Sequence, residues 1–143
     1  MPAALITALV FTVVLLVITA YFFMGSLPLL VLKHDTPMDS RFVRGFFKTY
    51  YLAVIFVAVA AASSYALAGR LALAIAAAAI GALAIALRLT IVARMDTLRL
   101  RIQDGDSNAI AGFRRMHLTA ILVNLALLVG IVGGLIAVSV QMK

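Results

Sequence analysis

The side chains of this chain that could bind a ligand sit at the edges of long uncharged runs. His117 and Asn124 lie seven residues apart in the stretch FRRMHLTAILVN (113–124), so on a helix they share one face about 10 Å apart. An amide in an apolar environment needs a hydrogen-bond partner, so Asn124 should face other helices. We therefore expect His117 and Asn124 to line a ligand site. The structural alternative has Asn124 bonded to a neighbouring helix and His117 as a cap at the membrane interface.

Arg88 is the third candidate ligand-binding residue, because it is the deepest cation of the third apolar run. If it faces inward, it could meet Asp35, Asp39 or an anionic ligand. Alternatively its long side chain reaches back to the membrane surface.

A metal or haem site is a further alternative. His34 ends the first apolar run and His117 begins the last, and Met116 adds a thioether next to it. Imidazole with thioether suits copper. The spacing of these residues matches no compact metal motif, so no cofactor is predicted, and haem or copper stays an alternative.

The composition excludes several classes of protein. Of 143 residues 66% are hydrophobic and 12% are charged, with neither glutamate nor cysteine. So few polar groups cannot cover a soluble core of this size, which indicates a membrane protein. Thiol chemistry and disulfides are excluded, and no Ser–His–Asp grouping is evident, so an enzyme is not expected. The net charge is +7, and the basic residues responsible for it flank the apolar runs. This placement indicates that they face a lipid surface and do not bind nucleic acid.

The chain therefore predicts an all-α, single-domain, integral membrane four-helix bundle of up-down topology over residues 1–143. The polar segment from Lys33 to Arg44 should be a loop, and Gly69 should end the second helix. The third helix should continue through the basic segment 94–102, and Ser107 or Asn108 should cap the last helix. The expected spans are about 4–32, 47–69, 71–93 and 117–140.

Basic residues are distributed very unevenly between the two ends of this bundle. Ten of the twelve fall on the side of the first and third loops, leaving Arg70 and Lys143 opposite. By the positive-inside rule both loops are cytoplasmic and both termini are outside, in a cell inner (plasma) membrane. The aromatic residues between Phe42 and Tyr51 should form an interfacial belt. A lipid-facing basic cluster is expected to bind anionic lipids and consists of Arg94, Arg99, Arg101, Arg114 and Arg115.

Small residues predict close helix packing. Ala77 and Gly81 are four apart in the third span, and Gly130 and Gly134 form a GxxxG pair in the fourth. Such pairs let helix backbones approach within the bundle, or else join copies in a homo-oligomer or larger membrane complex.

The pattern formed by Phe113, His117, Asn124 and Leu125 resembles that of the DUF4149, or transmembrane-protein-205-like, family of four-helix membrane proteins. The segments FFKTYY (46–51) and RLTIVARMDTLRLRIQDGD (88–106) fit the same resemblance. Family members often have Gly and Ser soon after the histidine, where this chain has Leu118 and Thr119. The resemblance implies the fold and no defined activity. We expect a non-enzymatic inner-membrane protein that binds or passes a small ligand, or an accessory membrane subunit.

Overall fold

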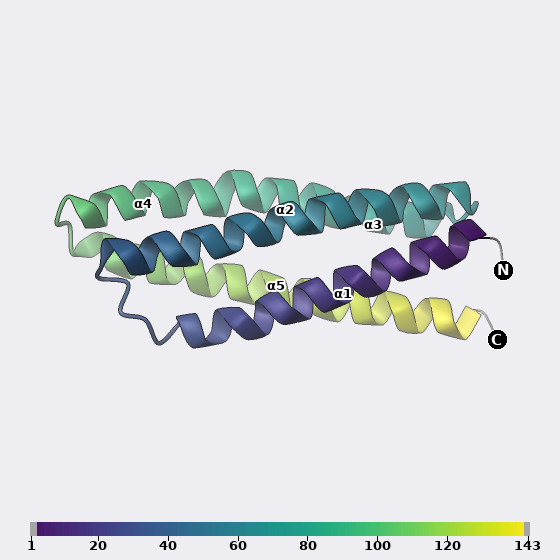
Figure 1. Cartoon of the computed structure of the whole chain (residues 1–143), viewed down its shortest axis with the longest axis horizontal. Helices are drawn as coiled ribbons and strands as arrows, with labels where there is room; N and C mark the ends of the chain where they lie inside the picture. The colour runs from purple at the N-terminus through teal and green to yellow at the C-terminus, as the bar shows by residue number, and fades with distance from the viewer. Residues whose placement is uncertain (1–2, 142–143) are drawn as a thin grey trace.

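The computed structural model describes residues 3–141 and is helical throughout, without a strand in that range. Its helices form four long rods lying roughly side by side (Figure 1). The third rod is one continuous helix made of three pieces. The elements in chain order are α1 (Ala3–Leu29), α2 (Pro37–Leu67), α3 (Leu71–Leu87), the π-helical segment η1 (Arg88–Val92), α4 (Ala93–Gln103) and α5 (Asn108–Gln141).

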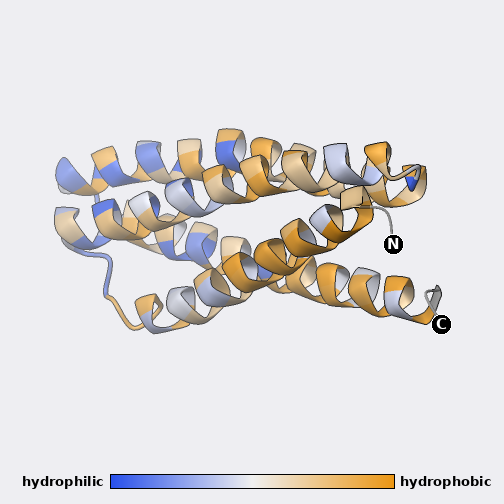
Figure 2. Cartoon of the chain, turned by 45° about the vertical axis from the view of Figure 1, so that its right-hand side comes forward, coloured by the Kyte–Doolittle hydropathy of each residue, from blue (hydrophilic) through white to orange (hydrophobic). Residues whose placement is uncertain are grey.

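All four rods are long and apolar enough to cross a membrane, as expected for a multi-pass membrane protein. The predicted all-α class is therefore confirmed at this level. Both described ends of the chain lie at the same end of the bundle, opposite the segments 30–36 and 104–107 (Figure 1). Hydrophilic residues gather at that opposite end, and the rest of the surface is mostly apolar (Figure 2). Lys143, which entered the orientation argument, lies outside the described residues.

Two helix ends are closed by the same glycine motif. Gly69 and Gly105 have positive φ angles of 71° and 86°, a conformation that glycine adopts at little cost. After α2, the N–H of Arg70 donates to Tyr65 O and the N–H of Gly69 donates to Ala66 O, which is a Schellman cap. The predicted helix stop at Gly69 is confirmed.

The second helix begins earlier than expected. The Thr36 side chain accepts from the N–H of Asp39 at 3.2 Å, and Pro37 occupies the first turn. These residues start a helix, because an N-cap threonine followed by proline satisfies the free backbone groups of its first turn. The prediction of a loop from Lys33 to Arg44 was therefore wrong beyond Thr36. Of the two residues expected to cap α5, Ser107 occupies the position before its first residue, while the side chain that bonds there is that of Asp106, which accepts from the N–H of Asn108.

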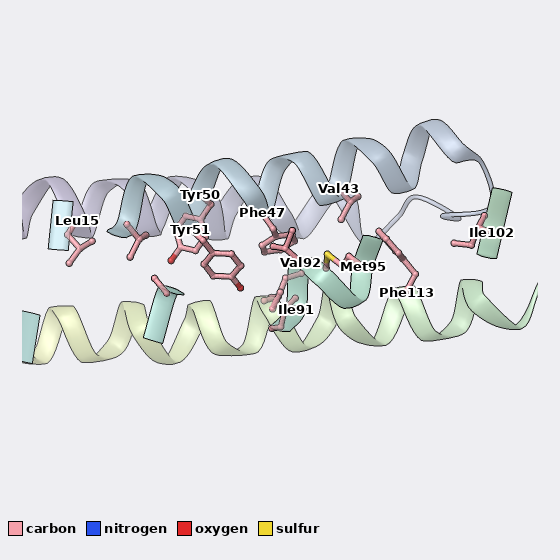
Figure 3. Packing of buried hydrophobic residues seen from close by; sticks show 14 of the residues in the cluster. Leu15, Val43, Phe47, Tyr50, Tyr51, Ile91, Val92, Met95, Ile102 and Phe113 are labelled. Atoms are coloured by element: carbon pink, nitrogen blue, oxygen red, sulfur yellow. The ribbon is translucent and has the colours of Figure 1, made fainter. Parts of the chain in front are cut away.

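Most of the aromatic residues of α2 that were expected at the membrane interface lie in the core instead. Of the five expected in an interfacial belt, Phe47, Tyr50 and Tyr51 have no exposed surface, while Phe42 is 60% exposed. The reason is that α2 is the central helix, packed against α1, α3 and α4. Its aromatic side chains therefore fill the core, where Figure 3 shows Phe47, Tyr50 and Tyr51 in a row.

Of the two predicted pairs of small residues, only the one in α3 takes part in close packing between helices. A Cβ at Gly81 would touch the Ala58 Cβ of α2 at 3.4 Å, so these two backbones are close. At Gly130 and Gly134 an added Cβ would meet nothing within 4 Å. The intramolecular role expected for this GxxxG pair is therefore not found, because both glycines line a cleft of about 80 Å³ facing α1, α2 and α3.

Candidate functional site

The two histidines of the chain meet in the interior. Nε2 of His34 and Nδ1 of His117 are 3.2 Å apart, and neither side chain has exposed surface. His34 belongs to the segment between α1 and α2, and His117 lies in the third turn of α5, nine residues after its start. We call these two residues the histidine pair. The His117 ring is covered completely by protein, in part by the side chain of His34.

Aromatic rings enclose the histidine pair. The Phe113 ring centroid is 5.5 Å from that of His34, and the Phe47 centroid is 5.5 Å from that of His117. On the α1 side the His117 ring lies near the backbone of Ser26. The two outer ring nitrogens, His34 Nδ1 and His117 Nε2, have no hydrogen-bond partner among residues 3–141. The two histidines thus bond to each other, and their outer nitrogens lie near the backbone of Leu32 and of Ser26 outside good hydrogen-bond geometry.

The backbone of His34 is held in an uncommon conformation. Its φ angle is 60°, the left-handed region that costs a residue with a Cβ about 1 kcal/mol or more. Burial lowers the pKa of His34, and the Arg114 guanidinium acts in the same direction. The nearby backbone of Leu32 and the carboxylates of Asp39 and Asp35 oppose this change in pKa. The net effect is a lowered pKa of His34, with burial as the main cause.

A second group of polar side chains lies deeper in the bundle. It consists of Thr19, Tyr50, Tyr51 and Asn124, which we call the hydroxyl–amide cluster. All four are at most 1% exposed, and none of their side-chain oxygen or nitrogen atoms has a hydrogen-bond partner within the described chain. The rings of Tyr50 and Tyr51 are neighbours, with centroids 5.2 Å apart. Thr19 lies close to the Tyr50 hydroxyl, outside good hydrogen-bond geometry.

Helix register brings Asn124 to this cluster. Because α1 and α5 are antiparallel and His117 lies beside Ser26, Asn124 lies two turns further along α5, at the level of Thr19 on α1. His117, Asn124 and the other buried residues of α5 all fall on one inward face. The histidine pair and the hydroxyl–amide cluster therefore lie along the same inward face of α5, two helical turns apart, and we call them together the polar seam. It runs about 10 Å from the histidines to the amide.

Arg88 lies at the edge of the polar seam. The contact between Gly81 and Ala58 sets the register of α3 against α2, and it places Arg88 at the level of Tyr51. Arg88 is half-buried, and it forms no ion pair with any residue from 3 to 141. It also opens the π-helical segment η1, a local irregularity often found at functional sites.

The remaining predicted residues are not at the seam. Met116 lines a surface groove between α4 and α5 with Arg94, Leu98 and Arg115. Within the basic cluster, Arg99 lies 4.0 Å and Arg101 2.5 Å from an aspartate oxygen, while Arg94, Arg114 and Arg115 are exposed. Arg44, which the sequence did not single out, joins Asp96 at 2.7 Å and ties α2 to α4.

Three residues of the seam were missed by sequence reasoning. Thr19, Tyr50 and Tyr51 are ordinary residues of apolar helices, and hydroxyls there usually bond to their own backbone. A usable signal existed, since Thr19 and Ser26 are seven apart on α1, just as His117 and Asn124 are on α5. No protein-family model, curated protein or solved structure matches this chain.

Proposed function

We propose that this chain is a non-enzymatic, multi-pass membrane protein whose polar seam binds or passes a small polar ligand. The observation that carries the proposal is the hydroxyl–amide cluster. Its four side chains are buried without a protein partner, and leaving such a group unpaired in an apolar interior costs about 1–3 kcal/mol. A cost of this kind is offset when the groups bind a small molecule or ordered water. The approach of Thr19 on α1 to the Tyr50 hydroxyl on α2 is the one contact between helices within the cluster, and it leaves Tyr51 and Asn124 without a partner among residues 3–141.

The histidine pair is placed to control access to this cluster. His34 belongs to the segment 30–36 at the hydrophilic end of the bundle, and His117 lies two helical turns from Asn124 on the side of that end. Two imidazoles that share one hydrogen bond can exchange donor and acceptor roles, so they can relay a proton or adapt to a ligand that donates or accepts a hydrogen bond. Arg88, half-buried at the level of Tyr51, adds a positive charge near the same line.

The setting proposed for the protein is the cell inner (plasma) membrane, with both loop ends cytoplasmic and both termini outside. The basic cluster would then face the anionic leaflet. Gly130 and Gly134 are exposed in the cleft that they line with α1, α2 and α3, and this cleft leaves room for a helix of a second copy or of another membrane subunit. A relation to the DUF4149 proteins is part of this proposal and concerns the fold only.

Native mass spectrometry of the purified protein, extracted from its own membrane, tests the ligand. We expect a small-molecule adduct on the wild type that is lost in Asn124→Leu. Thr119→Val is the matched control, because Thr119 lies on the exposed face of α5 and bonds only to Arg115 O. An adduct that survives Asn124→Leu, or no adduct on the wild type, contradicts the proposal.

Copper binding is a second candidate function, and the distance within the histidine pair favours it. Imidazole nitrogens bind metals at about 2.0–2.1 Å, so two ligands of one tetrahedral ion lie about 3.3–3.4 Å apart. The observed 3.2 Å is close to this edge length. The bound ion would take His34 and His117 as two ligands, since residues 3–141 hold no group of three or more His, Cys, Asp or Glu. It would supply a redox-active or transported cation at the entrance of the seam.

Haem fits these residues poorly. A porphyrin plane cannot pass between two nitrogens that are already in hydrogen-bond contact, so the histidine pair would have to separate. Metal analysis of the wild type and of His34→Asn after exposure to Cu(I) separates the two candidates. Copper bound one to one by the wild type and lost in His34→Asn supports copper, whereas a metal-free protein with a small-molecule adduct supports the first function.

A further inference from the structure

A groove on the outer surface lies between α1 and α2, near the hydrophilic end of the bundle. Its volume is about 670 Å³, and it is separate from the polar seam. Phe22 and Phe46 stack against each other at 4.6 Å between ring centroids, and both line it. Met38, Phe42 and Tyr21 are 79%, 60% and 70% exposed, so they form an apolar rim that no other part of residues 3–141 covers.

Arg41 is the cation that lines the groove. It is exposed, and it makes no ion pair with the residues that the structure describes. The neighbouring Arg44 is occupied by Asp96 and is not available. From Arg41 the groove continues past Gly45 to Thr49, where the uncharged run of α2 begins. Lys48 is also exposed and lies two turns from Arg41 on the same side of α2.

Gly45 keeps the middle of the groove open. A Cβ at this position would meet nothing within 4 Å, so the glycine does not serve close packing of α2 against another helix. Met38 and Thr49 are 11 residues apart, which gives a channel about 16 Å long on the surface of α2. Its charge lies at the hydrophilic end and its apolar floor leads toward the span.

We propose that this groove binds one anionic phospholipid, with the headgroup phosphate at Arg41 and an acyl chain along Gly45, Phe46 and Phe22. The order of a cation followed by an apolar channel matches the order of a headgroup followed by a chain. An anionic headgroup is favoured over a zwitterionic one because a cation at a membrane surface contributes about 1 kcal/mol toward anionic lipid. This site is distinct from the smaller groove between α4 and α5, about 340 Å³, which Arg94 and Arg115 of the basic cluster line and Arg114 does not.

Lipid retention in nanodiscs tests the site. The protein is placed in discs of phosphatidylglycerol and phosphatidylcholine in equal amounts, and the lipids that remain bound are counted by native mass spectrometry. The wild type should retain phosphatidylglycerol in preference to phosphatidylcholine. Arg41→Gln should lower that preference about fivefold, the equivalent of one surface cation. Gly45→Leu should reduce retention of both lipids, because a Cβ there meets no atom within 4 Å and the leucine side chain extends into the channel.

Arg114→Gln is the control, since Arg114 is exposed at the same end and off the groove. It should leave the retained phosphatidylglycerol unchanged. The site is refuted if Arg41→Gln and Gly45→Leu both behave as wild type. It is also overturned if Arg114→Gln reduces retention as much as Arg41→Gln, because the effect would then be one of total charge. Equal wild-type retention of phosphatidylcholine removes the headgroup assignment.

Discussion

At the scale of single residues, the chemistry of this chain depends on which polar groups the helices bury. The sequence indicated that His117 and Asn124 share a face and that His34 lies near the last helix. It could not indicate that His34 would reach the His117 ring, because that contact depends on a loop residue with a positive φ angle. Loop conformation of this kind is set by tertiary contacts and leaves no periodic pattern in the sequence.

The buried state of His34 predicts a pH-dependent stability. Burial lowers its pKa in the folded protein, whereas the unfolded chain takes up the proton near the ordinary value of about 6.5. The unfolded state therefore binds more protons below this pH, and the free energy of unfolding should fall as the pH drops below about 6.5. Thermal unfolding in detergent measures this change from about pH 5 to about pH 8, the range in which histidine titrates.

His34→Asn is the variant for this measurement, because asparagine tolerates a positive φ angle and does not titrate. It should flatten the dependence of the unfolding temperature on pH. His117 still titrates in the variant, so part of the slope should remain. Identical slopes for the two proteins would show that His34 does not carry the effect.

At the scale of elements, the sequence predicted most of the helices and the stop at Gly69. Hydropathy alone gives the four spans, since an uncharged run of this length has few other structures available. The start of α2 was missed because Asp35, Thr36 and Pro37 were interpreted as helix breakers, although Thr36 and Pro37 together form an N-terminal cap. The π-helical segment η1 was also missed, since the inserted residue leaves no signature in hydropathy.

The glycines offer a matched pair of substitutions. Gly69→Ala should lower the free energy of unfolding by about 1 kcal/mol, because alanine is strained at a φ angle of 71°. Gly133→Ala should leave stability unchanged or raise it slightly, because that glycine is helical and a Cβ there meets open space. Thermal unfolding of both variants against the wild type checks this. Equal destabilisation by the two would contradict the Schellman cap as the reason.

At the scale of the whole molecule, the bundle places both described ends together and gathers the hydrophilic residues opposite them (Figure 1, Figure 2). This arrangement arises because the four helical rods run antiparallel to their neighbours and are joined by short connections. The sequence predicted this up-down topology. Reporters fused at the C-terminus should behave as periplasmic, and reporters in the segment 104–107 as cytoplasmic. The opposite pattern would refute the orientation and would move the entrance of the polar seam to the other face of the membrane.

The central claim is that the hydroxyl–amide cluster is kept for a ligand and not for the fold. Replacing its members by apolar residues of similar shape, in Thr19→Val, Tyr50→Phe and Asn124→Leu combined, removes buried groups that have no protein partner. The thermal stability of this triple variant, measured without added ligand, is the most direct test. We predict that its unfolding temperature equals or exceeds that of the wild type, because unpaired buried groups cost about 1–3 kcal/mol each. A clear loss of stability would contradict the account and make the cluster a structural link between helices.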